Sequence, residues 1–376
     1  MVVTGHTSAP DPAGPGPAAD AAAGPPGRGS RSVSIRDVAA AAGVSYQTVS
    51  RVINGHPSVR ASTRELVRAT IEALDFRPNR AARALAGGPI QSVTVVTPNT
   101  TLYGPTQALQ GIEEAARAAG FGVGVRVVES VVPEEVGDAV ARAIEPGGAL
   151  VVIAYDEVGT MALAAVPPGI PMAAMVETPE ADEGSGKPWV WVDDRKAALE
   201  ATRHLLGLGH RTVHYLAIPS STRPSPRHAG WRAALQAAGA PVPDHVQCDW
   251  TPRSGYQAGL ALAADPDVTA VLCGNDDLAI GVMRAMHEAG RAIPGEVSVV
   301  GFDDMPISKF LTPSLTTVRL DFAELGRSCF ALLQALLEPQ AGPPTATRPE
   351  PELIIRESAG PPPLPRGSGP TRAAAT

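Results

Sequence analysis

Short runs of β-branched and other apolar residues alternate along most of this chain with longer stretches of helical periodicity. The runs lie at 92–97, 122–128, 149–154, 213–218, 270–274 and 297–302. Strands that are apolar along their whole length predict parallel sheets buried on both faces, with helices as the crossover connections. The segment from 91 to 357 is longer than one compact sheet domain, so we expect two parallel-sheet lobes. A ligand cleft would lie between them, beyond the carboxyl ends of the strands.

Residues 35–54 have the spacing of a second, all-α unit, a helix-turn-helix. Gly43 lies where the turn favours a left-handed backbone, and Ser45 is a good N-cap for the helix that follows. The two helices would touch through Val38, Ala39, Ala42, Val44, Val49 and Val52. Polar and aromatic side chains suited to base edges in a major groove would then face outward, namely Tyr46, Gln47, Ser50 and Arg51. A small helix pair with an ordinary polar face has the same pattern.

Charge is unevenly distributed along the chain. The 376 residues have a net charge of −7, yet residues 31–86 contain nine arginines and four acidic residues. A basic module joined to an acidic body is typical of a nucleic-acid-binding domain attached to a domain with another task. A chance fluctuation on a solvated surface would look the same.

The sequence resembles the LacI/GalR family of transcriptional regulators over residues 33–357. The headpiece matches from VSIRDVAAAAGVSYQTVSRVING to PNRAARAL, and the body matches in YGPTQALQGIEEAARAAG, VDDRKAALEATRHLLGLGH, CGNDDLAIGVMRAM and VVGFDDMPISKF. The resemblance implies an all-α helix-turn-helix headpiece followed by an α/β, two-lobed body like that of periplasmic binding proteins. It further implies a repressor that binds double-stranded, palindromic operator DNA as a homodimer and is released by a small-molecule effector, a sugar.

Five segments follow from the patterns and the resemblance together. We expect a disordered arm at 1–32, the helix-turn-helix domain at 33–78, a hinge helix and linker at 79–90, the effector-binding and dimerisation body at 91–357, and a disordered tail at 358–376. The two ends contain mainly small residues and proline, with too few large apolar side chains to offset the entropy of ordering.

The resemblance also assigns DNA contacts in the headpiece. Ser45, Thr48, Ser50 and Asn54 would touch phosphates, together with the start of a third helix expected at 61–74, while Tyr46, Gln47 and Arg51 would read bases. The Tyr46–Gln47 pair is that of one particular member of the family. The Arg51 guanidinium suits the O6 and N7 atoms of guanine.

The family's hinge helix corresponds to residues 79–85, with Asn79, Arg80, Ala82 and Leu85 as DNA contacts. Ala82 and Leu85 would enter the minor groove, where Leu85 would wedge a central base step. The alternative is a linker leucine that packs on the body. Because isolated helices shorter than about 12 residues are marginal in water, we expect the hinge to fold only on DNA.

Six effector contacts carry over from the family's sugar site. Arg227, Asn275 and Asp303 would bind sugar hydroxyls, Trp250 and Phe322 would support the ring, and Leu102 would line the other lobe. This mixture of planar hydrogen-bonding groups and aromatic faces suits carbohydrates. Without the family resemblance, the sequence is equally consistent with Trp250 as a core residue, Asp303 as a turn cap and Arg227 as a surface charge.

Some positions depart from a well-characterised member of the family. Leu320 stands where that member has a glutamine, and Val176, Glu177 and Ser130 fall where its cleft is arranged differently. The same effector is therefore not expected. The C-terminal heptad helix is absent, so no tetramer is expected by that route.

Enzymatic readings fail on their chemistry. GSGKP at 184–188 lacks the first glycine and the Ser/Thr of a phosphate-binding loop. His210 and His214 lie on an expected strand, where their spacing separates them. The pairs Asp193–Asp194, Asp276–Asp277 and Asp303–Asp304 have no partner nucleophile or metal. We therefore expect neither an enzyme nor a cofactor or metal.

The expected location is the cytoplasm, with association with the nucleoid when operator DNA is bound. The sequence has no apolar stretch of membrane-spanning length and no secretory signal, and Cys248, Cys273 and Cys329 form no disulfide framework. A sugar-binding transport receptor would account for the body, but it would need a secretory signal and has no use for a helix-turn-helix.

Overall fold

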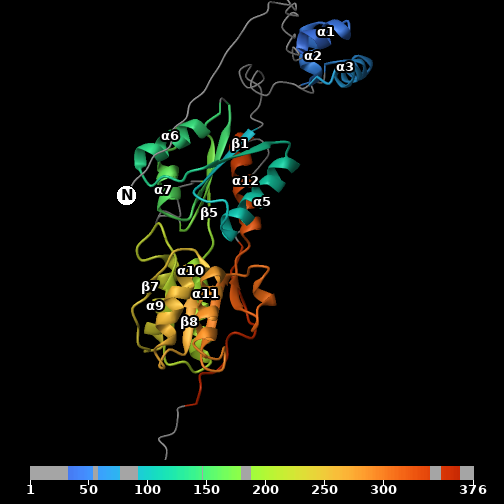
Figure 1. Cartoon of the computed structure of the whole chain (residues 1–376). Helices are drawn as coiled ribbons and strands as arrows, with labels where there is room; N and C mark the ends of the chain where they lie inside the picture. The colour runs from blue at the N-terminus through green and yellow to red at the C-terminus, as the bar shows by residue number, and fades with distance from the viewer. Residues whose placement is uncertain are drawn as a thin grey trace, which may run out of the picture. The chain divides into compact units, whose positions relative to one another are not determined.

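The computed structural model describes residues 33–53, 58–76, 92–145, 147–178, 188–338 and 349–364. They divide into two compact units, one up to Arg80 and one from Ala81 onward. The first contains the N-terminal helices, and the second contains two sheets with the helices that cover them (Figure 1). The expected arm at 1–32 and the whole of the expected hinge and linker at 79–90 lie outside the described residues.

The first unit begins with a helix-turn-helix, as predicted. Helix α1 (Ile35–Ala41) starts at a capping box, in which the Ser34 backbone N–H donates to Asp37 Oδ2 at 2.8 Å. Gly43 follows with φ of +63°, the left-handed backbone that glycine adopts without strain. Helix α2 (Tyr46–Ile53) starts after Ser45, whose Oγ accepts the Thr48 backbone N–H at 3.1 Å. Local capping chemistry therefore sets both ends of the turn.

Helix α3 (Ala61–Ala73) closes the small core of this unit. Five of the predicted contact residues are buried in it and Val44 packs against it half-buried. Val67 of α3 and Phe76 just beyond it complete the core. The two-helix pattern did not identify these two residues, because they come from outside the motif.

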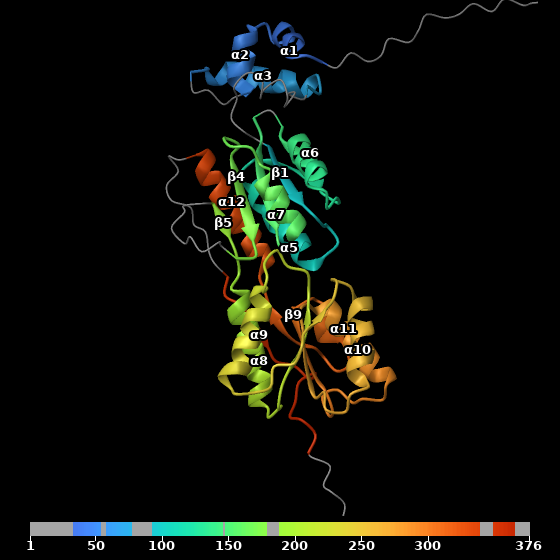
Figure 2. The ribbon, with the colours of Figure 1, turned by 90° about the vertical axis from the view of Figure 1, so that its left-hand side faces the viewer.

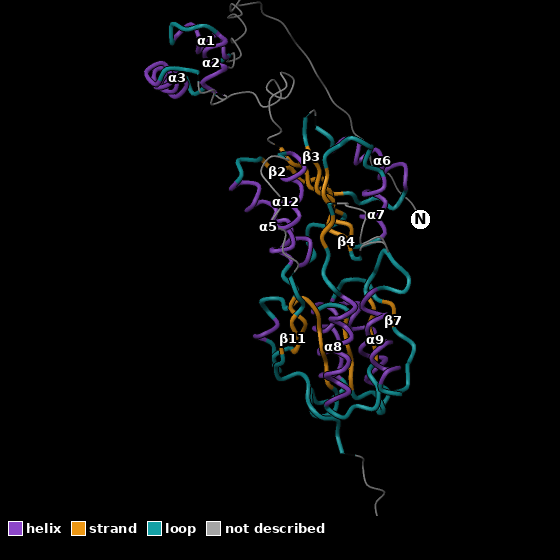
Figure 3. The backbone as a smooth tube through the Cα atoms, turned by 180° about the vertical axis from the view of Figure 1, so that it is seen from behind, coloured by secondary structure: helices purple, strands orange, loops and turns teal. Residues whose placement is uncertain are grey.

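The first lobe of the body is a five-stranded parallel sheet with strand order β2-β1-β3-β4-β5. Its strands are β1 (Ser92–Thr97), β2 (Gly122–Val127), β3 (Ala149–Ala154), β4 (Met172–Val176) and β5 (Trp189–Val190). Four helices cover it: α5 (Tyr103–Ala118), α6 (Pro133–Ala143), α7 (Glu157–Ala164) and α12 (Phe322–Leu337). Helices α5 and α12 pack on one face and α6 and α7 on the other (Figure 3).

The second lobe is a six-stranded sheet with strand order β11-β10-β9-β8-β6-β7. Its strands are β6 (His214–Ala217), β7 (Val246–Gln247), β8 (Ala270–Cys273), β9 (Ser298–Asp303), β10 (Thr316–Arg319) and β11 (Glu352–Ile354), of which β11 alone runs antiparallel to its neighbour. Helices α8 (Asp194–Gly207) and α9 (Pro226–Ala237) cover one face, and α10 (Pro252–Ala263) and α11 (Asp276–Glu288) cover the other (Figure 2). A short 3-10 turn, η1 (Ser308–Phe310), precedes β10.

All six predicted strands are present, and the fold class is the predicted one. The central strand β3 is buried along its whole length, as expected. The expectation of burial on both faces is wrong for β2, which is half-buried at its start and exposed beyond. It lies at the edge of its sheet, where only β1 pairs with it.

The chain passes between the lobes twice within the described residues, from β5 into α8 and from β10 into α12. Helix α12 then packs so closely on α5 that a Cβ added to Gly111 would lie 1.9 Å from the Ala323 carbonyl oxygen. Each lobe therefore contains segments from distant parts of the sequence, and the carboxyl ends of both sheets face the crossing points.

The body ends later than the expected boundary at residue 357. Ser358 is fully buried and its Oγ donates to the Val299 carbonyl at 2.6 Å. The Gly360 carbonyl accepts Ser298 Oγ at 2.8 Å and lies 2.9 Å from His210 Nε2. The disordered tail expected from 358 is therefore wrong for 358–360, because backbone groups, which composition does not reveal, fasten this segment to the sheet. Residues 365–376 lie outside the described part of the chain.

Candidate functional site

The exposed face of α2 presents the side chains predicted to read bases. Tyr46 is 51% exposed, Gln47 and Arg51 are exposed, and all three lie away from the buried Val49 and Val52. A solvent-exposed helix face with a phenol, an amide and a guanidinium can offer hydrogen bonds to base edges.

The predicted phosphate contacts differ in how they are held. Ser45 is exposed and also caps α2, and its hydroxyl lies 2.9 Å from that of Thr48. Thr48 and Ser50 are half-buried. Asn54 and the four hinge residues lie outside the described residues, namely Asn79, Arg80, Ala82 and Leu85.

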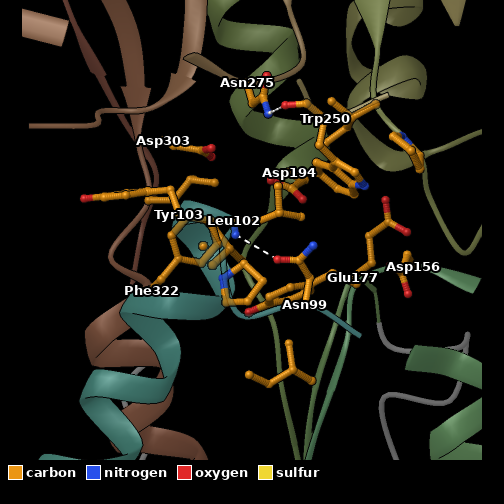
Figure 4. Close-up of a pocket in the computed structure, with 18 of the residues that line it drawn as sticks. Asn99, Leu102, Tyr103, Asp156, Glu177, Asp194, Trp250, Asn275, Asp303 and Phe322 are labelled. Atoms are coloured by element: carbon orange, nitrogen blue, oxygen red, sulfur yellow. Dashed lines mark hydrogen bonds between the residues drawn. The ribbon is translucent and has the colours of Figure 1, made fainter. Parts of the chain in front are cut away.

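A cavity of about 880 Å³, counting the space open to solvent at its mouth, lies between the two lobes (Figure 4). All six predicted effector residues line it: Leu102, Arg227, Trp250, Asn275, Asp303 and Phe322. Leu102 precedes α5 and Phe322 begins α12 in the first lobe, and the other four come from the second lobe. The side chains converge because both parallel sheets direct their carboxyl ends toward this space.

Arg227 is the buried cation of the cavity. Its side chain is 9% exposed, with Nε 3.2 Å from Asp194 Oδ1, and it donates to the Gly274 carbonyl and lies 4.4 Å from the Phe302 ring centroid. Burial by itself would lower the pKa of Arg227, but the charges of Asp194 and Asp303 outweigh it and raise the pKa. Arg227 is therefore not a surface charge, the alternative that the sequence left open.

Asn275 connects the cavity wall to two neighbouring segments. Its Oδ1 accepts the Leu278 backbone N–H at 2.8 Å and caps α11, and its Nδ2 donates to the Trp250 carbonyl at 3.1 Å. Trp250 packs partly against the apolar cluster under α10 and α11 and also lines the cavity. It therefore belongs both to the edge of the core and to the site.

Asp303 reaches the cavity from an unusual backbone conformation. Asp303 has φ of +105° and Asp304 has φ of +51°, a conformation that residues other than glycine adopt at a cost. Burial raises the pKa of Asp303 well above its ordinary value; the Arg227 charge lowers it, and nearby Asp276 raises it.

The turn after Asp303 is held from several sides. Asp304 pairs with Arg319 at 2.8 Å and with Arg356 at 2.5 Å. Asp276 Oδ2 accepts the Met305 backbone N–H at 2.8 Å. These bonds hold the strained backbone at Asp303 and Asp304 in place. Backbone strain of this kind clusters at binding and active sites.

Aromatic rings form the first-lobe side of the cavity. The Phe322 ring meets Tyr103 edge to face at 6.4 Å between centroids and Tyr155 at 6.2 Å. Leu102 and Leu320 add aliphatic surface to the lining. The first-lobe wall therefore combines aromatic and aliphatic surface with the polar side chains of Asn99, Asp156 and Glu177.

Sequence reasoning missed several lining residues, among them Asn99, Tyr103, Tyr155, Asp156, Asp194 and Asp277. Asp194 and Asp277 belong to acid pairs whose sequence pattern was interpreted only in terms of catalytic acids. Their position directly after apolar runs, at strand ends, was the available signal. Of the positions noted as departures, Val176, Glu177 and Leu320 line the cavity, whereas Ser130 lies elsewhere and bonds to Glu135.

Comparison with known proteins agrees with this architecture. Residues 34–79 match the family "Bacterial regulatory proteins, lacI family", and residues 202–359 match a periplasmic binding protein-like domain. The chain is 34% identical over 313 residues to the lactose operon repressor of Escherichia coli (strain K12), covering 82% of this chain and 86% of that protein. The chain belongs to the lacI family. It is a DNA-binding transcriptional regulator.

Other lacI-family proteins are similar over much of their length. Catabolite control protein A of Priestia megaterium is 31% identical over 316 residues, covering 80% of this chain and 91% of that protein. The crystal structure of the lac repressor dimer bound to operator and the anti-inducer ONPF superposes with a TM-score of 0.77 at 32% identity, covering 88% of this chain and all of that one. The complex of the regulator CelR with cellobiose has a TM-score of 0.62 at 27% identity, covering 87% of this chain. These relatives are transcriptional regulators and not enzymes.

The described residues contain neither a membrane-spanning helix nor a cluster of metal ligands. Within them no helix is both long and apolar enough to cross a membrane. The same residues contain no group of three His, Cys, Asp or Glu side chains arranged to hold a metal ion.

Proposed function

We propose that this lacI-family regulator represses transcription as a homodimer on a palindromic operator, and that a sugar bound in the inter-lobe cavity releases it. One observation carries the proposal: six residues predicted as sugar contacts, far apart in the sequence, line a single cavity. The chain combines this cavity with a helix-turn-helix unit, an arrangement for which a transport receptor has no use.

In this proposal the headpiece reads the operator through α2. Tyr46, Gln47 and Arg51 contact base edges, while Ser45, Thr48, Ser50 and Asn54 fix the register on phosphates. The exposure of the first three supports this division. The lac repressor structure, a dimer bound to operator, supports the homodimer and the two-fold symmetric site.

The cavity suits a sugar because it offers two kinds of surface. Arg227, Asn275 and Asp303 present hydrogen-bonding groups, and Trp250 and Phe322 present apolar faces. A ligand that touches both lobes favours one lobe arrangement over another by its difference in affinity for the two. The cellobiose bound by the regulator CelR is a further support for a saccharide.

The link between cavity and operator is the segment at 79–90. Asn79, Arg80, Ala82 and Leu85 would act as a hinge helix that enters the minor groove only in the operator-bound arrangement. Binding of sugar to the cavity and of operator to the headpiece then oppose each other, and by linkage each weakens the other equally. Such a regulator would act in the cytoplasm and on the nucleoid.

The test begins with a search for the operator. Selection from a random DNA pool should recover a palindrome, and fluorescence anisotropy on that labelled DNA should report release as sugars are titrated. Coupling of about 1–3 kcal/mol would weaken operator binding roughly 5- to 150-fold. Asp303→Ala should keep operator affinity and lose the sugar response, whereas Ala82→Gly should weaken operator binding and keep sugar binding. If the Asp303→Ala variant still releases operator DNA at the sugar concentration that releases the wild type, the effector site lies elsewhere.

A further inference from the structure

The cavity carries more negative than positive charge. Five carboxyl groups line it, from Asp156, Glu177, Asp194, Asp277 and Asp303. Among the described residues of its wall, Arg227 alone carries a positive charge. Arg227 is already engaged with Asp194 and with the Gly274 carbonyl. Most of the negative charge in the cavity is therefore not matched by a cation of the protein.

Neutral groups hold two of the other carboxylates. Glu177 accepts hydrogen bonds from the hydroxyls of Ser220 and Ser221, at 2.7 and 2.9 Å, and Asp156 accepts the Gly159 backbone N–H at 2.8 Å. Hydrogen bonds of this kind orient a carboxylate but add no positive charge.

The carboxyl groups also act on one another. Burial raises the pKa of Glu177, and the charge of Asp194 raises it further. Burial likewise raises the pKa of Asp277 and of Asp303. The Arg227 charge lowers the pKa of Asp303, and the charges of Asp276, Asp194 and Asp277 raise it. Crowded carboxylates in a partly desolvated cleft are stabilised by a bound cation.

Two further groups in the wall favour a polar, positively charged ligand. Trp250 lines the same cavity as Asp194 and Glu177 (Figure 4), and an indole face attracts a cation. The Tyr155 hydroxyl is buried on the cavity wall and has no hydrogen-bond partner among the described residues.

We propose that the effector of this regulator is a sugar with a protonated amino group, and that phosphorylated and acidic sugars do not bind. The inference rests on the proposed function, which assigns the cavity to a sugar. A neutral sugar would satisfy some carboxylates with hydroxyl donors but would leave their mutual repulsion in place. A phosphate would add to that repulsion.

Isothermal titration calorimetry on the full-length protein tests this with matched sets of hexoses. Each set contains the parent glucose or galactose, the analogues with an amine at carbon 2, 3 or 6, the N-acetylated amines and the 6-phosphate. At least one amino sugar should bind about tenfold or more tightly than its parent, since a unit charge near several carboxylates at low effective dielectric is worth that much. The N-acetylated form of that amino sugar has no positive charge, so it should bind no more tightly than the parent sugar.

The outcomes separate this inference from the proposed function. A parent sugar that binds as tightly as its amino analogues and releases the operator overturns the inference and leaves the proposed function intact. Tighter binding of a 6-phosphate, or no binding by any amino sugar, overturns the inference as well.

Charge-removing variants test which carboxylates are responsible. Asp277→Asn keeps the shape of a half-buried wall residue and should reduce the preference for the amino sugar over its parent several-fold. Glu134→Gln removes an exposed carboxylate from the first turn of α6, outside the cavity, and should leave the preference unchanged. An unchanged preference in both Asp277→Asn and Asp303→Asn overturns the inference.

Discussion

Glu177 of the first lobe is hydrogen-bonded to Ser221 of the second, with its Oε2 accepting the Ser221 backbone N–H at 3.1 Å and the Ser221 Oγ at 2.9 Å. Glu177 directly follows β4, and Ser221 follows β6, so the contact joins the lobes beside the cavity. Since only a few segments connect the lobes, we expect this contact to hold them in the arrangement described.

A double-mutant cycle measures that contact. Glu177→Gln and Ser221→Ala should each destabilise the body by about 1 kcal/mol, because a part-buried hydrogen bond contributes roughly that much. The double variant should lose less unfolding free energy than the sum of the two single losses, since both substitutions remove the same interaction. Urea unfolding gives the three free energies. Simple additivity would mean that the two residues do not stabilise each other.

Arg51 should determine the identity of one base in each operator half-site. Arg51→Ala should lose discrimination at a single guanine, worth about 1–3 kcal/mol for a bidentate contact. Arg203, exposed on α8 of the body, provides the matched control, and Arg203→Ala should leave the selected sequence unchanged. Selection from a random DNA pool gives the preferred sequence of each variant, and fluorescence anisotropy on labelled DNA gives its affinity. A uniform loss of affinity without a change in preference would assign Arg51 to the phosphates instead.

Arg227 and Asp194 should be strongly coupled in stability. Arg227→Ala leaves the Asp194 carboxylate in the cavity wall without its cation, and the removal of one partner of a buried pair costs about 3–5 kcal/mol. Asp194→Ala in the same chain should recover part of that loss, because no unpaired charge then remains. Thermal and urea unfolding measure both variants. If the double variant is less stable than Arg227→Ala, the ion pair is not the source of the effect.

Asp276 should make the stability of the body depend on pH. Burial raises the pKa of Asp276 to about 6 from an ordinary value of 3.8, even though Ser308, Thr317 and the Met305 N–H donate to it. A carboxyl with a raised pKa in the folded state binds its proton more tightly there. The stabilisation that protonated Asp276 gives the folded state is therefore fully present below about pH 4 and is lost as pH rises toward 6.

Asp276→Asn removes this titration. Relative to that variant, the wild-type free energy of unfolding should fall between pH 4 and 6 by on the order of 1–3 kcal/mol. Urea unfolding at half-unit pH intervals provides the comparison. Parallel pH profiles for the two proteins would contradict the assignment to Asp276.

The local features of this chain could be read from its sequence. The Gly43 turn, the Ser45 cap and the central strand at 149–154 depend on residues within a few positions of one another, and each lies where the pattern predicted. The six effector residues were found through motifs of the family, which carry positions that periodicity does not reveal.

Only the tertiary structure decided which distant residues meet. The exposed edge at β2, the return of α12 onto α5 and the fastening of 358–360 follow from strand order and crossovers, which local pattern does not specify. The Arg227–Asp194 pair and the Glu177–Ser221 contact form because two sheets place their carboxyl ends around one space. Charge in that space is a sum over segments far apart in the chain, so the acidity of the cavity became visible only once the chain was folded.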